Sequence, residues 1–156
     1  MIDDGRPPSS EAELLALSRM IEAWLARQAT ENPLVQSVAR DGQERRWVIR
    51  VTGDEKTLSA LWLELGQRSL AYETYLMPAP EENHAQLFEH LLRRNEKLRG
   101  ATFAIGAEDA IFLMGRVPNV TVDEIELDRI LGTLYQGIEL FFRPALRIGF
   151  ASRFAD

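Results

Sequence analysis

The stretch from Tyr72 to Val117 constrains the fold of this chain more than any other part of the sequence. It reads as a strand, a turn flanked by prolines, a helix and two further strands. The helix is predicted over Pro80–Leu98, because Pro80 suits a first helical turn and apolar residues recur at the 3.6-residue spacing of one helical face. Gly100 is typical of the left-handed residue that follows a helix. A helix set among neighbouring strands favours an α+β fold with an antiparallel sheet.

Short alternating runs, separated by turn residues, predict the strands of this sheet. Three strands precede the central helix as a meander and two follow it: Trp47–Val51, Thr57–Leu65, Ser69–Met77, Thr102–Gly106 and Ala110–Val117. Leu34–Ala39 is a candidate for one more short strand. Consecutive strands joined by short turns pair antiparallel, so we expect no parallel crossover in this part of the chain.

A first helix is predicted before the meander, over Ser10–Thr30. Ser10 and Glu13 have the spacing of a capping box, in which each side chain accepts a hydrogen bond from the other residue's backbone N–H. Residues 1–9 are polar and proline-rich, and we predict that they form a flexible tail. With 156 residues in all, the sequence predicts one domain over residues 10–156.

A last helix is predicted over Thr121–Phe142. Thr121 and Glu124 also have capping-box spacing. Pro144 is expected to bend or end this helix, because proline lacks the N–H that a helix interior needs. The predicted order is therefore helix, three-strand meander, helix, two strands, helix.

Composition excludes several classes of function. The chain has no cysteine, which excludes disulfides, thiol catalysis and cysteine-ligated metal sites. Its net charge of −6 argues against nucleic acid as a partner. There is no apolar run of transmembrane length, and the opening residues lack the pattern of a signal peptide. We therefore expect a cytoplasmic protein that binds neither membrane nor nucleic acid.

The chain also lacks the residue patterns of common catalytic and metal sites. His84 and His90 are six residues apart on one helix, a rotation of roughly 600°, so they cannot share a metal ion as an i, i+4 pair does. Glu81 and Glu82 are explained by the positive end of the helix dipole. No serine lies in a nucleophile elbow and no glycine run has phosphate-loop spacing. We predict no catalytic residue, no metal ligand and no cofactor, and hence no enzymatic activity.

One basic cluster stands out, at the end of the Pro80–Leu98 helix. It consists of Arg93, Arg94, Lys97 and Arg99. One interpretation is a solvated helix end whose positive charges complement the helix dipole. The other is a contact with an anion or an acidic peptide, made mainly by the planar guanidinium groups of Arg93 and Arg94.

The strands are apolar on both alternating sets of residues. A sheet with one face in water should instead alternate apolar with polar residues. Trp62, with either Tyr72 or Tyr75, is therefore predicted to contribute to a protein-binding surface, the choice between the tyrosines depending on strand register. The second face of the sheet would be covered by the last helix, by a second subunit or by a client protein.

Three segments resemble the YbjN-type family of bacteria, and in particular its actinobacterial branch. They are TYLMPAPEENHAQLFEHLLRRNEKLRGATFAIGAEDAIFLMGRVPN, VDEIELDRILGTLY and RPALRIGFAS, and the resemblance covers roughly Pro33 to Phe154. The family is described as sensory transduction regulators, with a fold similar to the type III secretion chaperones. The resemblance implies a small cytoplasmic α+β protein, often dimeric, that acts by binding and carries no catalytic residue.

These observations predict a non-enzymatic protein-binding domain with a regulatory or chaperone-like role, forming a homodimer and binding a further protein partner. The alternative is an enzyme or small-ligand binder that uses a polar pocket near Glu73, Tyr75, His84 and Arg116. A concave pocket with converging polar groups would favour the alternative, whereas a flat apolar patch or groove would favour protein binding.

Overall fold

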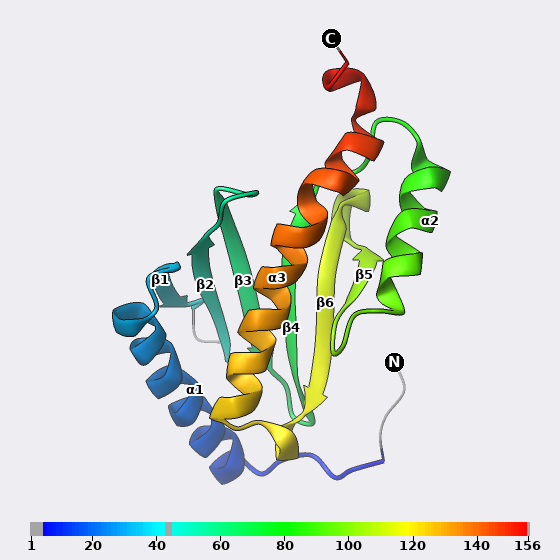
Figure 1. Ribbon diagram of the computed structural model, residues 1–156. Coiled ribbons are helices and arrows are strands. Elements are labelled where there is room, and N and C mark those ends of the chain that lie inside the picture. Colours follow the sequence, from blue (N-terminus) through cyan, green and yellow to red (C-terminus); the bar gives the residue numbers. More distant parts are fainter. Residues whose placement is uncertain (1–4, 43–44, 156) are drawn as a thin grey trace.

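The structure is a computed structural model that describes residues 5–42 and 45–155 (Figure 1). Its helices and strands are, in chain order, α1 (Glu11–Glu31), β1 (Val35–Arg40), β2 (Arg46–Thr52), β3 (Leu58–Leu65), β4 (Ser69–Met77), α2 (His84–Asn95), β5 (Thr102–Ile105), β6 (Ile111–Pro118) and α3 (Glu124–Gly149). The strands form one sheet in the order β1-β2-β3-β4-β6-β5, and all neighbours are antiparallel. The predicted α+β class and element order are confirmed, and the candidate strand over Leu34–Ala39 is β1, which makes the meander four strands long.

All three helices lie on the same face of the sheet (Figure 1). One core fills the space between them, and it includes residues of α1, α2 and α3 together with alternate residues of the strands. On β3 the buried set contains Leu61, Leu63 and Leu65, and on β4 it contains Leu70, Tyr72 and Leu76. Since side chains alternate along a strand, the intervening residues of β3 and β4 point to the opposite face.

The capping box at the start of α1 is confirmed. The Glu13 N–H donates to Ser10 Oγ at 3.1 Å, and the Ser10 N–H donates to Glu13 Oε1 at 3.0 Å. The capping box predicted at Thr121 is wrong. The N-cap of α3 is Asp123, whose Oδ1 accepts from the Glu126 N–H at 2.8 Å, while the Thr121 hydroxyl donates to the Pro118 carbonyl.

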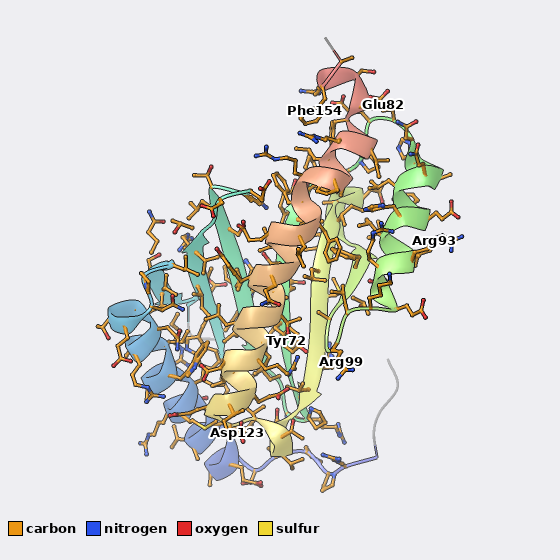
Figure 2. All side chains as sticks on the ribbon, viewed as in Figure 1. Tyr72, Glu82, Arg93, Arg99, Asp123 and Phe154 are labelled. Atoms are coloured by element: carbon orange, nitrogen blue, oxygen red, sulfur yellow. The ribbon has the colours of Figure 1, made fainter. Side chains whose placement is uncertain are left out.

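The predicted start of α2 at Pro80 is also wrong, because residues 81–83 serve another helix. The N–H groups of Glu81 and Glu82 donate to the Gly149 carbonyl at 2.9 and 3.1 Å, and Asn83 Nδ2 donates to the Ile148 carbonyl at 3.0 Å. Glu82 lies beside the C-terminal end of α3, where its carboxylate accepts from the N–H and hydroxyl of Ser152 (Figure 2). The loop before α2 thus caps the C-terminal end of α3.

Pro144 does not end α3, which continues to Gly149. The residue is exposed, so the carbonyl that loses its helical partner lies on the solvent side, where water can bond to it. The apolar side of the helix continues past the proline, with Ala145 and Gly149 buried.

Candidate protein-binding surfaces

Among the described residues, no helix covers the second face of the sheet, which we call the open face (Figure 1). Across it, Trp62 of β3 pairs with Glu73 of β4, and Glu73 pairs with Met114 of β6. Two residues along, Tyr75 pairs with Phe112, and the two rings meet edge to face with centroids 5.7 Å apart. The open face therefore carries large apolar side chains on both sides of Glu73, and the chain's own helices leave them uncovered.

The open face combines aromatic rings with charge. The guanidinium Cζ of Arg46 lies 4.1 Å from the centroid of the Trp62 ring, within the range of a cation–π contact. Tyr75 is 41% exposed, and desolvation together with the nearby Glu108 carboxylate raises the pKa of its phenol. Aromatic residues and arginine are the side chains enriched at protein interfaces.

A depression of about 340 Å³ lies at the centre of the open face. Its lining includes Trp62 and Met114, with charges of both signs around them: Arg46, Glu64, Glu73 and Arg116. This mixture suits contact with a partner that brings matching charges around an apolar centre.

The prediction for Tyr72 is corrected by the register of the sheet. Tyr72 pairs with Leu63, not with Trp62, so it points toward the helices and is only 1% exposed. Its hydroxyl donates to the Gly100 carbonyl and accepts from Arg129 Nη2 at 3.4 Å. Trp62 is therefore joined on the open face by Tyr75, and Tyr72 belongs to the core.

Arg93 and Arg94 do not lie with Trp62 and Tyr75. They project from α2, on the helix-covered side, with Arg93 outermost in the view of Figure 2. Arg93 forms an ion pair with Glu89 at 2.8 Å, and Arg94 Nη1 donates to the His90 carbonyl at 3.2 Å. The predicted protein-binding residues thus fall on two separate surfaces.

The polar pocket of the alternative prediction is formed only in part. Glu73 and Arg116 line the depression on the open face. His84, however, begins α2 on the helix side, where its ring lies 6.2 Å from that of Phe88. Neither do three or more histidine, aspartate or glutamate residues gather in the described ranges as a metal site would require. In the same ranges no helix is both long and apolar enough to cross a membrane.

A second surface, which sequence reasoning missed, lies between α2 and the edge strand β5. This α2–β5 groove has a volume of about 340 Å³ and is lined by Phe88, Leu91, Leu92, Phe103, Ala104, Ile105 and Ile111. Leu92 is 67% exposed and Ile105 is 53% exposed. The residue that could have indicated this groove is Leu92. It lies next to Leu91 and makes the apolar stripe of the helix wider than the part that the core buries.

The backbone edge of β5 is partly occupied. Phe103 and Ile105 are two residues apart, so their N–H and C=O groups face the same side, away from β6. Asn95 bonds with both groups of Phe103: its Oδ1 accepts from the Phe103 N–H at 2.6 Å, and its Nδ2 donates to the Phe103 carbonyl at 3.2 Å. Ile105 lies further along the same edge, beyond the reach of that amide.

The fold defines a class of protein. Solved structures with the same arrangement include the ExsC–ExsE complex, with 16% identity, a TM-score of 0.57 and coverage of 81% of this chain and 94% of the other. A second is the HopA1–SchA chaperone–effector complex, with 14% identity, a TM-score of 0.54 and coverage of 84% and 95%. A third is the heterodimeric ExoU–SpcU complex of the type III secretion system of Pseudomonas aeruginosa, with 16% identity, a TM-score of 0.50 and coverage of 76% and 92%. The domain therefore has the type III secretion chaperone fold.

Within that class the chain belongs to the YbjN family, whose model matches residues 18–147 and is described as "Putative bacterial sensory transduction regulator". An uncharacterised protein of Mycobacterium leprae is 31% identical over 107 residues, which are 69% of this chain and 58% of that protein. An uncharacterised protein of Mycobacterium tuberculosis is 30% identical over 105 residues, or 67% and 57%. The chain thus matches less than two thirds of the length of these relatives.

Proposed function

We propose that this chain is a protein-binding domain with a regulatory or chaperone-like role and no catalysis of its own. The observation that carries the proposal is the open face, where Trp62, Tyr75, Phe112 and Met114 lie around Glu73 and no described helix covers them. Monomeric proteins rarely leave large contiguous apolar patches in water. A protein partner that covers these apolar side chains would gain roughly 25 cal/mol for each Å² of apolar area removed from water.

The two exposed surfaces suit two kinds of contact. The α2–β5 groove is lined by apolar side chains alone, as permanent homodimer interfaces tend to be. The open face mixes rings with charges of both signs, as in interfaces whose partners also exist apart. We therefore assign homodimer formation to the α2–β5 groove and binding of a further protein to the open face.

The fold relatives support the same proposal. The HopA1–SchA structure is a chaperone–effector complex, and ExoU–SpcU is a heterodimeric complex, so the fold is used for protein binding in those proteins. The proposal treats residues 10–156 as one domain. It also places the protein in the cytoplasm, because a chain without cysteine forms no disulfides and does not require an oxidising compartment.

Three arginine substitutions test the roles of the two surfaces independently. Leu92→Arg places a charge in the α2–β5 groove, and Trp62→Arg places one at the centre of the open face. Leu15→Arg is the matched control, because Leu15 is 51% exposed on α1, away from both surfaces. Light scattering at high micromolar concentration should give a dimer for wild type, Trp62→Arg and Leu15→Arg, and half that mass for Leu92→Arg. A monomeric wild type would refute the dimer, and halving by Trp62→Arg instead would reverse the assignment of the surfaces.

The partner is sought by affinity capture from the native host followed by mass spectrometry. Proteins captured by wild type and by Leu15→Arg, but not by Trp62→Arg, are the expected open-face partners. Each is then purified and titrated against the three proteins. Equal affinity for wild type and for a folded Trp62→Arg variant would contradict binding at the open face.

A further inference from the structure

Lys56 holds an irregular place in the sheet. It lies in the turn between β2 and β3, and its Nζ donates to the carbonyls of Tyr75 at 2.7 Å and Leu76 at 3.1 Å. The pairing of β4 with β6 shifts register between Tyr75 and Met77, which marks a bulge at Leu76. In a regular strand successive carbonyls point to opposite sides, so one ammonium group reaches both only because the bulge turns them together.

The surroundings of Lys56 are aromatic and contain no counter-ion. Nζ lies 5.0 Å from the ring centroid of Tyr75 on β4 and 5.4 Å from that of Phe142 on α3. In the described ranges no carboxylate lies within ion-pair distance of it. Lys56 therefore clamps the β2–β3 turn to β4 and α3 through two carbonyls and two rings.

In the described ranges no carboxylate near the clamp pairs with Lys56, although Oε1 of Glu139 is buried without a hydrogen-bond partner. Glu55, on the same turn, pairs with Arg143 of α3 at 2.8 Å, and the Glu55 N–H donates to Glu139 Oε2 of α3 at 3.1 Å. Further titratable groups in this region are Asp54 on the turn, Tyr75 on β4 with the Glu108 carboxylate near it, and Tyr135 of α3 near Asp54 and Glu139. None of these groups compensates the buried positive charge at ion-pair distance.

Burial accordingly lowers the pKa of Lys56 from 10.5 to about 8. A lysine with a pKa of about 8 is ~25% neutral at pH 7.5, whereas one with the ordinary pKa of about 10.4 is ~0.1% neutral. A neutral amine still has two N–H donors for the two carbonyls, and it carries a lone pair, which is the nucleophile in reactions with an electrophile.

We propose that Lys56 is an acylation site for activated acyl donors, namely thioesters and acyl phosphates, and that acylation releases the β2–β3 turn from β4 and α3. The Nζ lone pair attacks the acyl carbon, and an N–C bond forms as the C–S or C–O bond breaks. The thiolate or phosphate leaves, and the surplus proton of the amine passes to solvent. The resulting amide is uncharged and keeps one N–H, so it loses both ring contacts and at least one carbonyl bond.

The sequence supplies an internal standard for this reaction, because Lys97 is the other lysine of the chain and lies exposed at the end of α2. Wild-type protein is incubated with acetyl phosphate, or with acetyl coenzyme A, between pH 6.5 and 9.5, and acetylation of each lysine is followed by peptide mass spectrometry. Lys56 should react about tenfold faster than Lys97 at pH 7.5, and its rate should level off above pH about 8. The preference should disappear in urea. The two donors show which leaving group the site accepts.

The structural consequence is measured by hydrogen exchange over residues 53–58. Exchange there should be several-fold faster in protein acetylated at Lys56 and in Lys56→Gln, but unchanged in Lys56→Arg, which keeps the charge and its donors. If Lys97 reacts as fast as Lys56 in the folded protein, the acylation site is refuted. If hydrogen exchange in the acetylated protein equals that of the unmodified protein, the release of the turn is refuted. Neither the acetylation rates nor the exchange rates depend on partner binding.

Discussion

Tyr72 and Gly115 lie directly opposite each other on β4 and β6, and the ring of Tyr72 fills the space that a side chain at residue 115 would need. The carbonyl of Gly100 borders the same space and accepts the hydrogen bond of the Tyr72 hydroxyl. The missing side chain at one position thus lets a buried tyrosine tie the loop after α2 to the centre of the sheet.

The first prediction is that Gly115→Ala destabilises the fold. The added methyl group meets the Tyr72 ring and the Gly100 backbone, so the free energy of unfolding should fall by about 1–3 kcal/mol. Gly132→Ala is the control, since Gly132 lies in α3 with nothing within 4 Å of the added carbon. That change should be neutral or stabilising by up to ~1 kcal/mol. The free energies of unfolding are measured by urea titration followed by circular dichroism. Equal changes for the two substitutions would contradict the packing described.

The second prediction concerns the start of α3. Asp123→Ala should lower the free energy of unfolding by about 1 kcal/mol, because the Glu126 N–H loses the acceptor that caps the helix. Thr121→Ala should cost less, because the Thr121 hydroxyl donates only to the Pro118 carbonyl on the exposed turn. Urea titrations of the two variants show which substitution lowers the free energy of unfolding more. A larger loss of stability for Thr121→Ala would support the capping box that the sequence predicted.

The third prediction is a pH dependence of stability that depends on Lys56. The pKa of Lys56 is about 8 in the folded chain, whereas an unfolded lysine stays protonated up to about pH 10.4. Between these values the unfolded state binds more protons, so stability contributed by this group rises with pH. The arginine of Lys56→Arg stays charged throughout and should show no such rise. The unfolding free energies of the two proteins are compared at pH 7.5, 8.5 and 9.5, and a difference that does not change with pH would refute the prediction.

The fourth prediction uses tryptophan fluorescence. Trp24 and Trp47 are 2% and 1% exposed, while Trp62 is partly exposed on the open face. Iodide should therefore quench one component of the emission, and Trp62→Phe should remove it. A partner bound to the open face should protect that component. Quenching that survives Trp62→Phe would show that another tryptophan is accessible.

Much of the fold is readable from local patterns. The repeat of apolar residues predicts the helices, and the turns between alternating runs predict the strands and their antiparallel order. The capping box of Ser10 and Glu13 was predictable because both partners lie within one helical turn. In these cases the interaction that decides the structure is short in sequence.

Two of the errors, the start of α2 and the choice between the tyrosines, come from interactions that are long in sequence. Pro80 looks like a helix start, but residues 81–83 are held by the end of α3, about 70 residues further along, as in the contact of Glu82 with Ser152. Tyr72 and Tyr75 are an odd number of positions apart, so one of them must face the helices. Both alternating sets of β4 side chains are apolar enough to lie on that side, so the sequence of β4 does not show which one. Pairing with β3 decides between them, and pairing is not a property of β4 alone.

The side-chain amide of Asn95 has a consequence for how this protein behaves when it is crowded. By bonding with both backbone groups of Phe103, it takes the place that the peptide group of a further strand would occupy. An uncovered strand edge beside apolar side chains is otherwise a starting point for open-ended stacking of chains into fibres. One amide from α2 thus blocks the edge of β5 at Phe103, which limits growth of the sheet at that position and leaves the apolar groove beside it available.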